Sequence, residues 1–340
     1  MKRCVFLLTA IALAIGMIAP SSVAAAGPAT DGSTKNLHPR VIATFPTGYE
    51  FNSFAESLAV APGGELYATV TIWKDGTSDV GKLYRIGPGG RMRQVGPDLA
   101  VGILSGLAFD DRGYLYAGVI AFGPGDEPAG VLRFAPDGSV TRAVTLPEGT
   151  FPNGLAFHDG ALYIADSGFG AIWKAYPAMG RIATLTEPWI EDPTLAPTGG
   201  LGVNGIAFRG GALYGVNADT GAVVRIPVNR NGGAGRPSLV VAPNADMIGA
   251  DGVAFDVDGG LWVAINHGDE TVGGALVRVG PYGHPTVVAN DPGWLDYPAQ
   301  PAFGVTQATR TTLYVVNGSL NTGNCNVIAL NVGVAGAPLP

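Results

Sequence analysis

The sequence predicts an all-β fold, a six-bladed β-propeller whose ring is closed by an N-terminal strand that completes the last blade. Three observations predict it: a sixfold internal repeat, a strand-type pattern inside every copy, and one spare strand before the first copy. The copies start 47 to 52 residues apart. Their first residues, called head residues below, are Glu56, Ser105, Asn153, Asn204, Asp251 and Phe303.

Each copy has the pattern of a propeller blade. In the third copy, a short run from Asn153 to His158 is followed by a turn, and a second run carries Leu162-Tyr163. A third strand, such as 172–175, and a weaker fourth strand follow. Four antiparallel strands in 40–50 residues are typical of a propeller blade. The aromatic residue of each second strand is expected to pack between blades, and these residues are Tyr67, Tyr116, Tyr163, Tyr214, Trp262 and Tyr314.

The two ends of the repeat region predict how the ring closes. The last copy ends after its third strand, near Leu330, and the segment 40–45 reads as the missing outer strand. Closure removes free sheet edges, which otherwise promote aggregation. The predicted organisation is a signal peptide at 1–26, a flexible lead at 27–39, the propeller at 40–333 and a tail at 334–340.

The N-terminus has the pattern of an export signal. Lys2 and Arg3 precede an apolar run at 5–18, and small residues follow at 23–26. We therefore expect a secreted or extracytoplasmic protein that keeps no membrane anchor after cleavage. Cys4 would leave with the signal, so Cys325 is expected to be a free, packed thiol in a mature chain without a disulfide.

Composition narrows the classes of partner. The formal net charge is −7, and no cluster of Lys and Arg suits a phosphate backbone, so a nucleic-acid partner is excluded. The chain has 52 glycines and 47% hydrophobic residues, which favours short strands and tight turns over disorder. A small-molecule ligand or substrate is the remaining expectation.

The head residues predict a metal site. Because the first strand of every propeller blade lines the central channel, Glu56, Asn153, Asn204 and Asp251 are expected to converge on the axis. Two carboxylates would repel in a narrow channel, whereas a dication would neutralise them. Oxygen donors of this kind favour Ca²⁺, although another divalent cation is possible, and the lack of His or Cys disfavours zinc. The alternative is that these Asn and Asp residues, which are common before Gly in turns, simply cap the starts of strands.

These residues resemble the senescence marker protein/gluconolactonase family, which includes regucalcin and is related to diisopropylfluorophosphatase and the paraoxonases. The resemblance implies a Ca²⁺-dependent hydrolase acting on a lactone or related ester, with Glu56, Asn153, Asn204 and Asp251 as metal ligands. It implies that Asp251 is the catalytic residue, as general base or nucleophile, with a metal-bound water as the rival attacking group. Phe303 departs from members that have a histidine there, and Ser105 has no assigned role.

Other candidates have structural interpretations beside functional ones. Acidic and amide residues at the ends of second strands are expected to satisfy turn backbones more often than to reach the pocket; they are Asp166, Asn217 and Asn317. The histidines show no metal spacing; they are His158, His267 and His284. Tryptophans in long loops would form either an apolar rim or packing contacts; they are Trp73, Trp189 and Trp294. The alternative function is a non-enzymatic, NHL-like binding propeller with a structural metal.

Overall fold

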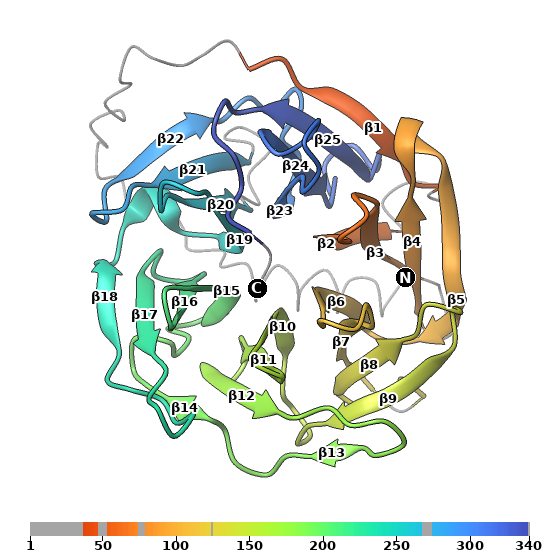
Figure 1. The fold of residues 1–340 in the computed structure, drawn as a ribbon, viewed down its shortest axis with the longest axis vertical. Helices are drawn as coiled ribbons and strands as arrows, with labels where there is room; N and C mark the ends of the chain where they lie inside the picture. Colours follow the sequence, from red (N-terminus) through yellow and green to blue (C-terminus); the bar gives the residue numbers. More distant parts are fainter. Residues whose placement is uncertain (1–36, 47–52, 74–78, 124, 267–273, 339–340) are drawn as a thin grey trace.

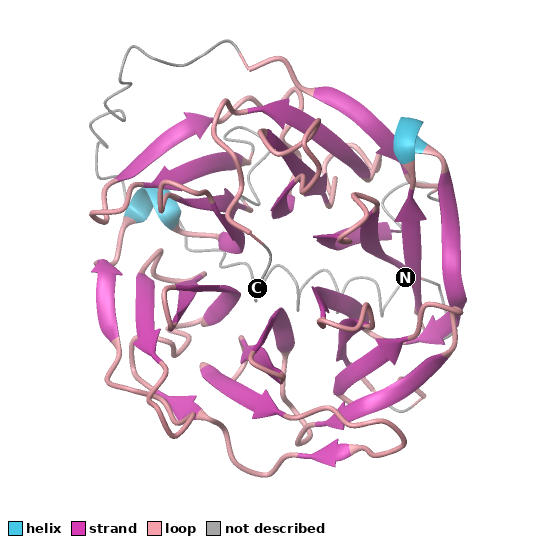
Figure 2. Ribbon diagram, in the orientation of Figure 1, coloured by secondary structure: helices cyan, strands magenta, loops and turns pink. Residues whose placement is uncertain are grey.

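A computed structural model describes residues 37–46, 53–73, 79–123, 125–266 and 274–338, and the predicted six-bladed β-propeller is confirmed (Figure 1). Six sheets, antiparallel except for one added two-residue strand, are arranged around a central axis (Figure 2). In the described residues the only helical segments are two single 3₁₀ turns, η1 (Pro88–Gly90) and η2 (Ala245–Met247). No helix among the described residues is long and apolar enough to span a membrane. The predicted signal peptide and most of the lead lie outside the described residues.

The first three blades follow the order predicted from the repeat. Blade 1 comprises β2 (Ser53–Val60), β3 (Leu66–Ile72), β4 (Val80–Ile86) and β5 (Met92–Ala100). Blade 2 comprises β6 (Ile103–Phe109), β7 (Leu115–Ile120), β8 (Gly130–Phe134) and β9 (Val140–Thr145), with β13 (Ala183–Thr184) added in parallel to β9. Blade 3 comprises β10 (Pro152–His158), β11 (Ala161–Asp166), β12 (Ala171–Ala175) and β14 (Ile190–Glu191).

The last three blades complete the ring. Blade 4 comprises β15 (Val203–Arg209), β16 (Ala212–Asn217), β17 (Val223–Pro227) and β18 (Ser238–Val241). Blade 5 comprises β19 (Ala250–Phe255), β20 (Leu261–Ile265), β21 (Ala275–Val279) and β22 (Pro285–Ala289). Blade 6 comprises β23 (Pro298–Phe303), β24 (Thr312–Asn317), β25 (Asn326–Asn331) and β1 (Arg40–Thr44). The N-terminal strand β1 pairs antiparallel with β25, so the predicted closure is confirmed.

Packing between blades repeats one aromatic contact. In blades 1 to 5, the Tyr or Trp of the second strand lies against a Phe at or next to the end of the inner strand of the next blade. The ring-centroid distances range from 4.8 to 6.1 Å, and the pairs are Tyr67–Phe109, Tyr116–Phe157, Tyr163–Phe208, Tyr214–Phe255 and Trp262–Phe303. Such pairs contribute about 1 kcal/mol each beyond the area they bury. The expectation that these aromatics form the inter-blade core is therefore confirmed.

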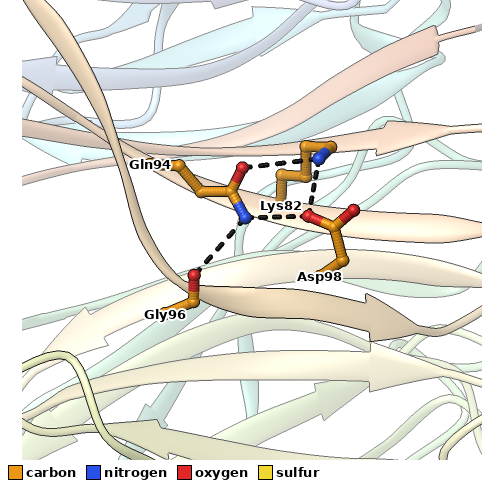
Figure 3. A network of polar contacts seen from close by, with 4 residues as sticks. All are labelled: Lys82, Gln94, Gly96 and Asp98. Atoms are coloured by element: carbon orange, nitrogen blue, oxygen red, sulfur yellow. Dashed lines mark hydrogen bonds and ion pairs between the residues drawn. The ribbon is translucent and has the colours of Figure 1, made fainter.

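Polar contacts fasten the outer edge of blade 1. Lys82 Nζ donates to Asp98 Oδ1 at 2.5 Å and to Gln94 Oε1 at 3.3 Å, while Gln94 Nε2 bonds to Asp98 Oδ1 at 2.8 Å (Figure 3). Gln94 Nε2 also reaches the carbonyl of Gly96 at 3.4 Å. The network fixes the path of β5. Because Asp98 is half-exposed, solvent screens its ion pair with Lys82, and the network adds little stability.

The segment after β25 returns to the channel end opposite the head residues. It runs toward the centre in Figure 1, and Gly336 forms a bridge with Asp256 at the end of β19. Val257 N donates to the Ala335 carbonyl at 2.9 Å, and Ala337 N donates to the Phe255 carbonyl at the same distance. Gly336 N also donates to the carbonyl of Arg310, in the turn after the inner strand of blade 6. Residues 335–337 therefore connect the C-terminal ends of the inner strands of blades 5 and 6, on the side away from the candidate site.

Candidate metal centre at the channel mouth

The head residues of blades 1 to 5 lie in the inner strands and not in turns. Asn153, Asn204 and Asp251 are the second residues of β10, β15 and β19. The pairing with the next strand shifts at the head residue and the residue after it, as in a β-bulge, and it does so in β2, β6, β10, β15 and β19 alike. Bulges re-aim side chains at functional sites. The structure therefore places these residues at the starts of inner strands, within bulges.

The glycine after the head residue is required by close packing between neighbouring inner strands. A Cβ atom added to Gly154 would lie closer than 3.0 Å to the carbonyl oxygen of Asn204, and one added to Gly205 would meet the carbonyl of Asp251 in the same way. Gly106 has the same relation to the carbonyl of Asn153. Each inner strand contacts the next, from β2 around to β23 and back. The head residues of blades 3, 4 and 5 are consequently held on adjacent, tightly apposed strands.

Blade 1 has Ser57 where blades 2 to 5 have this glycine. The Ser57 hydroxyl accepts a hydrogen bond from the Leu107 backbone N at 3.0 Å, and Ser57 N donates to Thr69 Oγ1 at 3.0 Å. Ser105, the head residue of blade 2, is fully buried and donates its hydroxyl to the Pro152 carbonyl at 2.7 Å. The side chain of Ser105 therefore connects blades 2 and 3.

The sixth head residue requires a correction. Phe303 pairs with Leu313 in the position where Phe157 pairs with Leu162, and Trp262 packs on Phe303, so Phe303 ends its inner strand. The position equivalent to a head residue is Ala299, which is fully buried. The head residue of blades 2 to 5 is followed by glycine, but Ala299 is followed by Gln300. The sequence alignment of the repeats therefore used the later Phe303-Gly304 pair, four residues too far along the chain.

Electrostatic coupling joins Glu56 and Asp251 across the channel. Burial raises the pKa of Asp251 to about 7, although hydrogen bonds from Asn266 and Asn204 act to lower it. Glu56 keeps part of its surface accessible, yet burial raises its pKa well above the usual value, and the negative charge of Asp251 raises it further. No basic residue in the described part of the chain is among the groups that shift either pKa.

Asn266 is a member of the site that the sequence did not identify. Its Nδ2 donates to Asp251 Oδ2 at 3.2 Å, and its buried Oδ1 has no hydrogen-bond partner among the described residues. The residue directly follows β20, so it reaches Asp251 from the second strand of the same blade. A buried amide oxygen without a partner is costly unless an ion, a water or a ligand satisfies it.

The structure thus brings three of the four predicted ligands into electrostatic or hydrogen-bonding contact, namely Glu56, Asn204 and Asp251. Asn153 lies on the adjacent inner strand and is buried. The set fits a hard dication: two desolvated carboxyl groups, amide oxygens beside them and an unpartnered Asn266 Oδ1. The described residues contain no cluster of three or more His, Cys, Asp and Glu side chains suited to a metal. Amide ligands would therefore have to supply half of the predicted set.

The residues at the ends of the second strands have structural roles, as expected. Asp166 Oδ1 accepts hydrogen bonds from the backbone N of Phe151 at 2.9 Å and Phe169 at 3.2 Å, and its Oδ2 accepts from Trp173 Nε1 at 3.0 Å. Asn217 Nδ2 donates to the Thr194 and Ala196 carbonyls. Asn317 Nδ2 donates to the Trp294 carbonyl and to Asn326 Oδ1.

The remaining histidine and tryptophan candidates lie away from the head residues or make packing contacts. His158 ends β10 and stacks on Phe208 at 4.2 Å, while His284 precedes the outer strand β22 and His267 lies outside the described residues. Trp189 donates to the Gly232 carbonyl at 3.0 Å and packs edge-on against Tyr163. Trp294 packs on the core between blades 5 and 6. Trp73 stacks on Phe54 with 6.4 Å between ring centroids.

No protein-family model matches the chain, and no curated protein matches it. Solved structures do. Regucalcin from Agrobacterium tumefaciens strain C58, a calcium-binding protein, aligns with a TM-score of 0.58 and 18% identity over 88% of this chain and 98% of its own. An auxiliary nutrient binding protein from Bacteroides ovatus aligns with a TM-score of 0.60 and 14% identity, over 89% of this chain and 77% of its own. A gluconolactonase from Xanthomonas campestris aligns with a TM-score of 0.50 and 19% identity, over 87% of this chain and 89% of its own. At these identities the likeness establishes a shared fold.

Proposed function

We propose that the protein is an exported, Ca²⁺-dependent hydrolase that opens a lactone or cleaves a related ester at the channel mouth. One observation supports this above the others: Asp251 and Glu56 are desolvated carboxyl groups whose charges interact, and no described basic group compensates them. A bound dication would remove that cost. Solved structures of the same fold include a calcium-binding regucalcin and a gluconolactonase, which agrees with the proposal.

Glu56, Asn153, Asn204 and Asp251 would hold the cation, with Asn266 beside them. When bound, the cation supplies positive charge that polarises the carbonyl oxygen of the substrate. Export is expected from the pattern of residues 1–26, as described above.

The chain's own residues provide the base and its orientation. Asp251 is 7% exposed, and Asn266 Nδ2 fixes one of its carboxylate oxygens at 3.2 Å. A carboxylate held in this way can take a proton from a water molecule as that water attacks the carbonyl carbon. The bond between the carbonyl carbon and the ring oxygen then breaks, and the proton passes to the departing oxygen, which gives a hydroxy acid. The narrow, bulged ring of inner strands keeps Asp251 and its amide partners in place during this exchange.

The test is a panel of lactones and esters assayed with Ca²⁺-loaded protein. We expect hydrolysis that chelation removes and that Asp251→Asn lowers at least a thousandfold. Asp256→Asn is the matched control, because Asp256 is also a buried carboxylate of blade 5 but bonds to Trp262 and Arg278 away from the head residues. Full activity of the Asp251 variant, or loss of activity only in the Asp256 variant, would refute the assignment.

A single turnover in H₂¹⁸O separates the two roles open to Asp251. A general base puts ¹⁸O into the product in the first turnover. A nucleophilic carboxylate instead transfers one of its own ¹⁶O atoms first.

The second candidate is a binding propeller in which the cation is structural, and the fold shared with a nutrient binding protein favours it. Under this alternative, chelation lowers the melting temperature but no lactone or ester in the panel is hydrolysed.

A further inference from the structure

Three phenylalanines lie at the mouth end of blades 2 and 3. Phe122 follows the end of β7, Phe151 precedes the start of β10, and Phe169 lies in the turn between β11 and β12. The head residues lie at the starts of the inner strands, so all three phenylalanines are at the same end of the channel. Phe151 is two residues from Asn153, about 7 Å along an extended chain. We call Phe122, Phe151 and Phe169 the phenylalanine wall.

The wall is held by specific contacts. The Phe122 and Phe151 rings have centroids 6.4 Å apart with planes tilted by 49°. The Asp166 carboxylate accepts hydrogen bonds from the backbone N of both Phe151 and Phe169, which fixes these two residues relative to each other. Asp126 Oδ2 accepts from Phe122 N at 2.9 Å. These contacts preorganise the wall, so a ligand would lose little free energy in ordering it.

The wall presents apolar surface to solvent. Phe122 is 37% exposed and Phe169 is 53% exposed, although large aromatic side chains are usually well buried. Phe169 also lines an open depression of about 580 Å³ together with Pro193 and Ala196. Apolar side chains of blade 3 and of the loop before blade 4 therefore share this depression. Exposed apolar surface beside a polar site is typical of ligand recognition.

Acidic side chains lie next to the wall. Glu191 and Asp192 line the same depression, and Asp126 lies beside Phe122. A sugar acid or another anionic substrate lying against the wall would therefore approach these acidic groups.

We propose that the phenylalanine wall binds an alkyl or aryl arm of the substrate, and that the substrate is an uncharged lactone or ester carrying such an arm. The inference rests on the proposed function, which identifies the reacting group of the substrate as a lactone or ester. It adds the chemical class of the rest of the substrate. Each methylene that leaves water to lie against the wall should raise affinity by a factor of up to about four.

The experiment uses two homologous series, in each case on Ca²⁺-loaded protein. Lactones with alkyl arms of increasing length are assayed for kcat/KM. The corresponding lactams, which resist hydrolysis, are titrated by calorimetry. We expect kcat/KM and lactam affinity to rise about twofold to fourfold for each methylene until the arm extends past the wall. Gluconate-type sugar lactones should be poorer substrates than alkyl lactones of the same ring size.

The variants are Phe122→Ala combined with Phe169→Ala, and Tyr282→Ala as the control. Tyr282 is 88% exposed in the turn between β21 and β22, at the opposite end of the blade. The double variant should flatten the dependence on arm length in both series, while the control keeps it. Melting temperature and Ca²⁺ affinity, measured on each variant, confirm that the fold is retained.

The two proposals fail separately. If no lactone is hydrolysed but lactam affinity still rises with arm length and falls in the double variant, the wall stands and the hydrolase assignment fails. If lactones are hydrolysed but neither series depends on arm length, or the double variant keeps the dependence, the wall has no role in recognition.

Discussion

Asp251→Asn should stabilise the metal-free protein at pH 8, although it removes a proposed catalytic residue. In the folded chain the pKa of Asp251 is raised by burial from its ordinary 3.8 to about 7. The unfolded chain therefore releases this proton more readily than the folded chain, so stability falls as pH rises from about 4 to about 7 and changes no further above that. At 1.36 kcal/mol for each unit of pKa, the cost is on the order of 4 kcal/mol at pH 8.

The assay is urea unfolding in the presence of a chelator at pH 5 and pH 8. The metal-free wild type should be less stable at pH 8 than at pH 5. The asparagine variant should lose the part of that difference that comes from Asp251 and keep the part that comes from the buried Glu56 carboxyl group. Asp256→Asn is the control, because this substitution should lower the stability of the metal-free protein at pH 8 where Asp251→Asn raises it. Burial raises the pKa of Asp256, but hydrogen bonds from Arg278, Trp262 and Gly260 outweigh it, so the pKa lies below the usual value. Removing that charge should cost about 2 kcal/mol at pH 8.

Adding Ca²⁺ should narrow the difference in stability between the two proteins. At a free concentration one hundred times Kd, the wild type gains about 2.7 kcal/mol, and the Asp251 variant gains little because it has lost a ligand. The reasoning is refuted if the metal-free wild type is equally stable at both pH values. It is also refuted if Asp251→Asn destabilises the chelated protein at pH 8 as Asp256→Asn does.

Three further outcomes are expected. Glu56→Gln removes one of the two anionic ligands and should weaken Ca²⁺ binding at least tenfold, as measured by calorimetry. Gly154→Ala forces a Cβ against the carbonyl of the next head residue and should lower the free energy of unfolding by more than 2 kcal/mol in urea titrations, while Gly199→Ala, with open space around it, should have little effect. Asp219→Ala removes a carboxylate that accepts four backbone N–H bonds from residues 198–201, so hydrogen exchange of that segment should accelerate at least tenfold in mass spectrometry.

The fold could be predicted because a propeller repeats its constraints in the sequence. Each blade needs an alternating inner strand, a turn and an aromatic residue that packs on the next blade, so the same residue types recur. The blade 6 inner strand broke that signal. Its start has Ala299 and Gln300 where blades 2 to 5 have a polar residue and glycine, and Gln300 Nε2 donates to the Val253 carbonyl of blade 5 at 3.1 Å. Without the glycine, the repeat was aligned on Phe303 instead.

The candidate site was only partly predictable. Head residues share a repeat position, so their convergence followed from the fold class. Asn266 occupies a different position, and its contact with Asp251 exists only because β20 lies beside β19. The sequence left two roles open for the loop tryptophans, an apolar rim or packing contacts, and Trp189 and Trp294 pack inward. Side-chain direction in a loop depends on neighbours that are distant in the sequence, so phenylalanines form the exposed wall instead.

Calcium titration of the chelator-stripped protein at pH 8 tests the central claim most directly. The account predicts one Ca²⁺ per chain, with binding lost in the variant that combines Glu56→Gln and Asp251→Asn and retained in Asp256→Asn. Wild type that binds no calcium, or a double variant that binds it as tightly as the wild type, would contradict a shared cation at the head residues.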